Sequence, residues 1–212
     1  MKKILITVLL ALAAGATFIA VYTYKKSDTY KVQKEIADNI IRFHVRANSD
    51  STVDQELKLK VKDRVVQYLE EELGTAQSLD EARNILYDDM GNLEQIALDV
   101  IQSEGFAYDV NVYFETSYFP MKVYGDMSFP PGEYEALRID IGEACGRNWW
   151  CVLFPPLCFV DSACSVVPED TKEQFRSVLS EEAYDTLTIE DLREEKYQFR
   201  FKYLTFLNGF LD

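Results

Sequence analysis

The stretch IIRFHVRANSDSTVDQELKLKVKDRVVQYL, residues 40–69, combines two hydrophobic periodicities. At its start, apolar side chains alternate with Arg42, His44 and Arg46. This alternation predicts a β-strand with one buried face and one polar face. Ser51 then provides a helix N-cap, and the apolar residues that follow recur at helical spacing. A strand followed directly by an amphipathic helix indicates a domain that contains both kinds of element.

Two helices are predicted after this strand. The first begins at Ser51 and ends at about Leu73, where Gly74 supplies a C-terminal stop. The second covers residues 78–105, because a capping box opens it and apolar residues follow with helical periodicity. Gly91 lies inside this second helix and predicts a bend, since glycine weakens a helix interior.

Apolar runs in the middle of the chain predict further strands, at residues 108–115, 120–124, 134–141 and 149–154. The run at 149–154 has no charged residue, which indicates a strand buried on both faces. Residues 130–132, Pro-Pro-Gly, have the composition of a turn. We expect this turn to join 121–129 to 134–141 as a β-hairpin.

The C-terminal part differs in composition from the rest. Residues 167–185 are acidic with a helical pattern, and a short helix is expected at 189–195. Residues 197–203 alternate aromatic and polar side chains, which predicts a last strand. One strand, two helices, several antiparallel strands and a helical C-terminal part together predict an α+β fold.

The N-terminus has the pattern of an export segment. Lys2 and Lys3 precede an apolar run over residues 4–22. Residues 14–16, Ala-Gly-Ala, are a candidate cleavage site, whereas the length of the run approaches that of a membrane span. A cleaved signal peptide and a retained membrane anchor both remain open. In either case we expect a secreted or membrane-anchored protein whose remaining chain lies outside the cytoplasm.

Composition divides the chain into four parts. A signal peptide or membrane anchor is expected at 1–26, and a polar linker at 27–37. The α+β domain is expected at 38–164. A C-terminal extension that packs on the same domain is expected at 165–212.

The four cysteines, Cys145, Cys151, Cys158 and Cys164, lie close together in the sequence. An even number of cysteines in an exported protein indicates disulfides, and several pairings are possible. We favour Cys151–Cys158 nested within Cys145–Cys164, because two prolines bend the chain between the inner pair. The spacing fits a zinc site poorly, and the sequence has no C-x-x-C redox motif.

The sequence contains no familiar catalytic, cofactor-binding or metal-binding motif. A net charge of −14 argues against nucleic-acid binding, because a phosphate backbone needs a basic surface. His44 is the only histidine, and the strand pattern predicts that it lies on the polar face. Helix capping explains Asp50 and Asp54 better than a cation site does. We therefore expect a protein that is not an enzyme and that has no cofactor, metal or small-molecule substrate.

Trp149 and Trp150 are the only tryptophans, and they are adjacent. Burial of both is the simpler interpretation. In an alternating strand, however, neighbouring side chains point to opposite faces, so one tryptophan can face outward. An exposed tryptophan next to a proline bend is a candidate anchor for a partner, because tryptophan contributes strongly to interface energies.

Three long motifs resemble one known family. They are RANSDSTVDQELKLKVKDRVVQYL (46–69), FPMKVYGDMSFPPGEYEALRIDIGE (119–143) and NWWCVLFPPLCFVD (148–161), in the order typical of the stage II sporulation protein R family. The resemblance spans residues 38–161.

This resemblance implies a signalling role. Members of the family are made in the forespore of endospore-forming bacteria and exported into the space between the forespore and mother-cell membranes. There they activate a membrane-embedded aspartic protease, which removes the pro-segment of pro-sigma-E in the mother cell. A wall-binding or structural protein of the septal space and an exported thiol–disulfide enzyme remain as alternatives.

The resemblance also suggests where this protease would bind. We place the contact with the protease on residues 149–159 together with residues 119–132, where the family motifs are dense. Prolines also fix the shape of these segments, and a rigid surface loses less entropy on binding. The candidate partner-binding residues are Trp149, Trp150, Phe154, Pro155, Pro156, Phe129 and Pro130.

Overall fold

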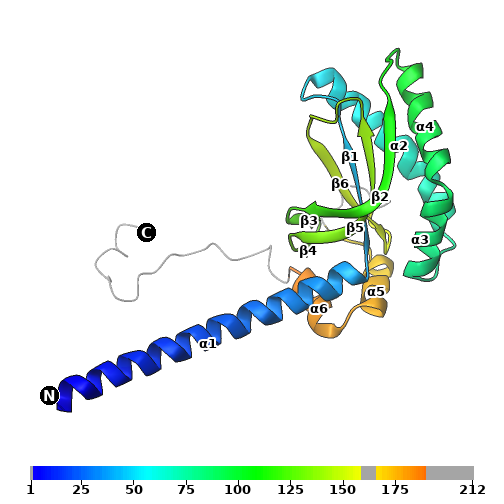
Figure 1. Ribbon diagram of the computed structural model, residues 1–212. Coiled ribbons are helices and arrows are strands. Elements are labelled where there is room, and N and C mark those ends of the chain that lie inside the picture. The colour runs from blue at the N-terminus through cyan, green and yellow to red at the C-terminus, as the bar shows by residue number, and fades with distance from the viewer. Residues whose placement is uncertain (1, 159–165, 190–212) are drawn as a thin grey trace, which may run out of the picture.

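A mixed four-stranded β-sheet lies at the centre of the fold, with helices packed around it (Figure 1). The computed structural model describes residues 2–158 and 166–189. Its helices are α1 (Lys2–Asp38), α2 (Thr52–Leu73), α3 (Leu79–Asp88), α4 (Met90–Ser103), α5 (Glu169–Val178) and α6 (Glu181–Leu187). Its strands are β1 (Ile41–Arg46), β2 (Val110–Phe119), β3 (Lys122–Tyr124), β4 (Met127–Phe129), β5 (Gly132–Ile141) and β6 (Asn148–Phe154). The predicted α+β fold class is confirmed.

The sheet has the strand order β2-β5-β1-β6. β1 runs parallel to β5 and antiparallel to β6, whereas β2 and β5 are antiparallel to each other. The predicted hairpin of 121–129 with 134–141 is therefore wrong. β5 pairs with β2 along the full ten residues of each strand, and the short β3 pairs with β4 around Gly125. Gly125 has a φ of 54°, a conformation that glycine adopts readily.

The helices α2, α3 and α4 cover one face of the sheet and form the main core with it (Figure 1). Phe43 and Val45 of β1 are fully buried in this core. The predicted N-cap of α2 is confirmed, because the hydroxyl of Ser51 accepts a hydrogen bond from the backbone N–H of Asp54 at 3.2 Å. The second predicted helix is divided into α3 and α4, which meet at Asp89.

A second core lies on the other side of the sheet, between the end of α1, the β3–β4 hairpin, α5 and α6. Ile36 of α1 and Ile40 just after it are fully buried there. Residues 27–37 are therefore helical and not the predicted linker. The physical reason is that Val32 and Ile36 stand one helical turn apart and both pack against this core. In the described part of the chain, no helix has the length and apolar character required to cross a membrane.

The C-terminal helices complete the second core. Phe175 of α5 and Leu187 of α6 are fully buried in it. The carboxylate of Glu35 on α1 accepts a hydrogen bond from the backbone N–H of Ser180 at 2.8 Å, which joins α1 to the start of α6. The predicted strand at 197–203, and the predicted short helix apart from its first residue, lie outside the described residues.

Candidate partner-binding face

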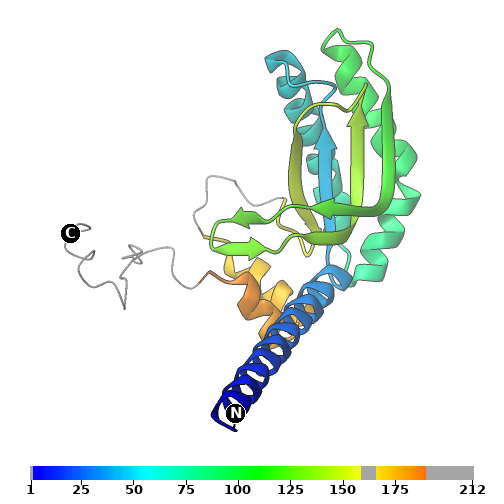
Figure 2. The ribbon, with the colours of Figure 1, turned by 60° about the vertical axis from the view of Figure 1, so that its left-hand side comes forward.

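We call the sheet surface turned away from α2 and α4 the open sheet face. Figure 2 shows this face, with β3 and β4 crossing its lower part. The strand register sets two rows of side chains across it, first Tyr113, Arg138, His44 and Trp150, and second Asn111, Asp140, Arg46 and Asn148. The positions between them carry the apolar residues that pack under the helices.

His44 lies within the first row and is only 4% exposed. Its ring stacks on that of Trp150, with centroids 5.0 Å apart and an interplanar angle of 1°, and Phe119 packs against both rings. Burial, assisted by the positive charge of Arg138, lowers the pKa of His44 to about 4, so the imidazole is neutral near pH 7. The prediction of a histidine on an exposed polar face is wrong, because aromatic side chains cover that side of β1.

Arg42, two residues earlier on β1, is fully buried. Its guanidinium carbon lies 4.5 Å from the ring centroid of Phe119 and also faces the rings of Phe129 and Tyr134. Its Nε donates to the carbonyl oxygen of Cys151 at 2.9 Å. Burial lowers the pKa of Arg42, and the surrounding rings stabilise the cation where water is excluded. This side chain joins the open sheet face to the second core.

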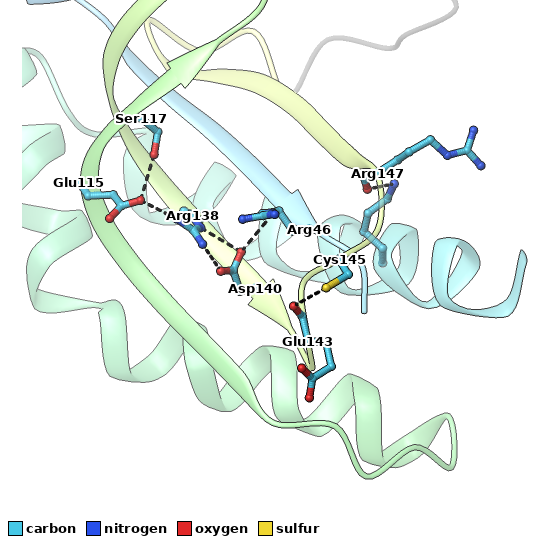
Figure 3. Close-up of polar contacts among 9 residues, drawn as sticks. Arg46, Glu115, Ser117, Arg138, Asp140, Glu143, Cys145 and Arg147 are labelled. Carbon is cyan, nitrogen blue, oxygen red and sulfur yellow. Dashed lines mark hydrogen bonds and ion pairs between the residues drawn. The ribbon is translucent and has the colours of Figure 1, made fainter. Parts of the chain in front are cut away.

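Charged side chains occupy the part of the face beyond the aromatic rings (Figure 3). Arg138 donates to Asp140 and to Glu115, in each case at 2.9 Å. These hydrogen bonds, led by the one to Asp140, raise the pKa of Arg138. Arg46 approaches Asp140 only to 4.0 Å, beyond hydrogen-bond distance. Arg138 is thus well paired, whereas Arg46 is not.

Several buried polar atoms of the open sheet face have no hydrogen-bond partner among the described residues. They are Nδ1 and Nε2 of His44, Nε of Arg46 and Oδ1 of Asn148. On the neighbouring strands β1 and β6, Arg46 lies opposite Asn148 and His44 lies opposite Trp150. Buried polar groups seldom remain unpaired, so this cluster makes the face a candidate binding surface.

Comparison with known proteins supplies the family. Residues 37–164 match the family described as Stage II sporulation protein R. The chain belongs to this family. The matched range contains β1 to β6 and the helices α2 to α4, and hence the whole open sheet face.

A curated relative supports the same assignment to the stage II sporulation protein R family. Stage II sporulation protein R of Bacillus subtilis (strain 168) is 41% identical over 139 residues, which are 66% of this chain and 61% of the relative. No solved structure matches the chain. Membership of the family supports a role in sporulation.

The two tryptophans of the NWWC motif point to opposite faces of β6. Trp149 packs edge-on against Phe43 of the main core, with ring centroids 5.7 Å apart. Trp150 lies on the open sheet face against His44. Both are half-buried, so neither full burial of the pair nor full exposure of one describes them.

The other candidate partner-binding residues do not form one surface with the tryptophans. Phe129 is fully buried and Phe154 nearly so, so neither side chain is accessible to a partner in this structure. Pro155 is buried as well, and it lines with the half-buried Pro156 a groove of ≈ 370 Å³ between the ends of α2 and α5. Pro130 is half-buried in the connection from β4 to β5. Trp150 alone among these candidates belongs to the open sheet face.

Cys151 and Cys158 form a disulfide, with their Cα atoms 5.5 Å apart, which is the inner pair expected from the sequence. Cys145 is exposed and has no disulfide partner among the described residues. Its expected partner, Cys164, lies outside them, so that pairing stays a prediction. Cys151 is 3% exposed. A thiol–disulfide enzyme needs an accessible cysteine of low pKa, and Cys151 is not accessible.

Sequence reasoning missed most of the open sheet face. Arg42, Arg138, Asp140 and Lys122 contribute to it, and none was expected to be functional. Alternation on β1 and on β5 could have indicated one shared polar face, but it could not show which distant aromatic residues cover part of it. Across the part of the chain that the structure describes, no cluster of histidine, cysteine, aspartate and glutamate is arranged to hold a metal ion.

Proposed function

We propose that this protein is an extracytoplasmic signal of sporulation that binds and activates a membrane-embedded aspartic protease, which then processes pro-sigma-E in the mother cell. The match of residues 37–164 to the stage II sporulation protein R family is the observation that carries this proposal. Because that range contains the complete sheet, the folded domain is the part that acts on the protease.

Activation by binding is a matter of free energy. A binding partner shifts a protease toward its active arrangement only if it binds that arrangement more tightly than the inactive one. A shift from about 1% to about 99% active requires a preference of about 5.5 kcal/mol. The rigid, packed sheet of this domain suits such a role, since little conformational entropy is lost when a preformed surface binds.

The burial of His44 supports a role in binding over one in catalysis. A general base must reach the proton that it removes, whereas this imidazole is 4% exposed and covered by Trp150 and Phe119. It is also the only histidine of the chain, so a serine or cysteine nucleophile has no other imidazole to activate it.

Genetic complementation tests the proposal. In an endospore-forming strain that lacks its own stage II sporulation protein R, the full chain should restore processing of pro-sigma-E, followed by immunoblot. A chain without residues 1–26 should fail, and the same chain behind the signal peptide of an unrelated secreted protein should work again. Failure of the exported, folded chain, or success of the chain that is not exported, would overturn the proposal.

A further inference from the structure

We propose that the open sheet face binds an acidic, extended segment of a protein partner, with a partner carboxylate against Arg46 and the segment lying along β6 beside Trp150. This inference rests on the proposed function, because it describes how this chain recognises the protein that it activates. Its chemistry follows from the unpaired atoms, the charges and the free edge of the sheet.

Buried polar atoms without hydrogen-bond partners among the described residues lie together on the open sheet face. His44 is 4% exposed, and both of its ring nitrogens lack a partner among the described residues. Arg46 Nε and Asn148 Oδ1 are buried on the same face, and neither has a hydrogen-bond partner in the part of the chain that the structure describes. Leaving one such atom unpaired costs roughly 1–3 kcal/mol. His44 lies beneath Trp150 and Phe119, so a docked partner meets Arg46 and Asn148 first. A bound partner that pairs those two side chains recovers part of that free energy, which makes them a source of affinity.

The kinds of atoms involved limit the chemistry of the ligand. Arg46 Nε is a donor and requires an acceptor, whereas Asn148 Oδ1 is an acceptor and requires a donor. The imidazole of His44 lies beneath Trp150 and Phe119, so its signals report on the site although it does not contact the ligand. A simple anion could pair only with the donors. A peptide with an acidic side chain supplies carboxylate and carbonyl oxygens as well as N–H groups, and therefore matches Arg46 and Asn148 together.

The charges favour an acidic segment. Arg138 is hydrogen-bonded to both Asp140 and Glu115, the carboxylates of this face. Arg46 makes only a long ion pair of 4.0 Å with Asp140. The ammonium group of Lys122 lies 5.6 Å from the ring centroid of Trp150. The face is thus locally basic on a chain whose net charge is −14. Complementary charge guides association and sets its orientation.

The position of β6 explains why the segment is extended. The strand order β2-β5-β1-β6 leaves β6 at the edge of the sheet, paired among the described strands with β1 alone. The accessible part of this edge is residues 148–150, which are half-buried, because Cys151 to Phe154 are buried and the carbonyl oxygen of Val152 already accepts from Leu157 and Cys158. An accessible strand edge presents backbone donors and acceptors that an extended peptide can pair with. A strand added there would run next to Asn148 and Trp150, and its side chains would be directed toward the same face as Arg46.

The single histidine provides the test. We would label the full chain with ¹³C and ¹⁵N and follow the His44 ring signals while adding a ten-residue peptide that alternates glutamate with threonine. A matched peptide with glutamine in place of glutamate measures the role of charge. We expect saturable His44 shifts with the glutamate peptide and binding about tenfold weaker with the glutamine peptide, because charge-assisted hydrogen bonds are the stronger ones.

Variants locate the site. Arg46→Gln should weaken binding of the glutamate peptide about tenfold, since it removes the positive charge and keeps a polar side chain. Arg64→Gln, the same change on the exposed surface of α2, should bind as the unchanged protein does. Lys122→Gln provides a second variant if Arg46→Gln does not fold. Each fold is checked by the amide spectrum.

Several outcomes would overturn the inference. One is that the glutamate and glutamine peptides bind equally well, and another is that neither causes a saturable shift of the His44 signals. A third is that Arg46→Gln and Lys122→Gln bind the glutamate peptide as tightly as the unchanged protein does. A fourth is that Arg64→Gln weakens binding as much as they do. Because this titration does not involve pro-sigma-E, its failure alongside successful complementation would reject the binding mode and leave the proposed function intact.

Discussion

His44 is buried, and neither ring nitrogen has a hydrogen-bond partner among the described residues, so its protonation is costly. Its pKa is about 4 in the folded protein, below the value of about 6.5 for an unperturbed histidine. The unfolded chain therefore binds more protons than the folded chain between these two values. This contribution to stability is fully present above about pH 6.5 and is lost as the pH falls toward 4.

Replacement of His44 by phenylalanine should remove this pH dependence. The ring of phenylalanine suits a site lined by Trp150 and Phe119, and no polar atom remains unpaired, so stability at pH 7 should stay within about 1 kcal/mol of the original. Between pH 7 and pH 5 the original protein should lose about 2 kcal/mol more than His44→Phe. Urea unfolding at pH 7 and at pH 5 measures this loss of unfolding free energy in each protein. Titration of the carboxylates contributes equally to both proteins, so it cancels in the comparison. An equal loss in both would show that the imidazole is not buried and neutral.

Residue-scale reasoning from the sequence succeeded for the apolar side of β1 and not for its polar side. Alternation placed Phe43 and Val45 in the core correctly, because burial of that face depends on the strand itself. Arg42 and His44 are covered by Phe119 and by residues still further along the chain. The periodicity of one strand does not show which residues from distant parts of the sequence pack over it.

At the element scale, the Cys151–Cys158 disulfide fixes the chain where β6 ends. Replacing both cysteines by alanine should lower the free energy of unfolding by about 2.5 kcal/mol, because the unfolded chain regains the entropy of the open loop. Cys145→Ala removes an exposed thiol and should leave stability unchanged within about 0.5 kcal/mol. Urea midpoints of the three proteins test this, and reduction of the original protein should reproduce the double variant. No change on reduction would mean that this bond does not stabilise the fold.

The docking of α1 is a second prediction for an element. Ile36→Ala should cost roughly 2–5 kcal/mol, because it opens a cavity in the second core where Ile36 is fully buried. Tyr30→Ala, on the same helix but 65% exposed, should cost less than about 0.5 kcal/mol. Thermal unfolding of both variants measures the contrast. Equal effects would mean that α1 is not anchored through its last turns.

Element types were easier to predict than their partners. The strand β1, the N-cap of α2 and the break between α3 and α4 all follow local signals that the sequence displays. The pairing of β5 with β1 and β2 depends on contacts between distant segments, and the Pro-Pro-Gly turn gave a misleading local alternative. Residues 27–37 are mostly polar, so the sequence predicted a linker there. The helical spacing of Val32 and Ile36, which pack on the second core, was not recognised.

At the scale of the whole molecule, one sheet separates two cores. The main core lies under α2, α3 and α4, and the second core connects the end of α1 to β3, β4, α5 and α6. Between them, part of the open sheet face is covered by neither set of helices in the described residues and carries Arg46 and Asn148, whose buried Nε and Oδ1 atoms have no hydrogen-bond partner there. A rigid scaffold that presents one such face suits a protein that acts by binding.

Reconstitution in a non-sporulating bacterium tests the central claim most directly. The full chain, the membrane-embedded protease and pro-sigma-E are produced together, and removal of the pro-segment is followed by immunoblot. We expect cleavage only when all three are present, and none when the protease is replaced by a variant lacking its catalytic aspartates. Cleavage that is equally strong without this chain, or that is absent although the chain is folded and exported, would contradict the claim that it is the activating signal.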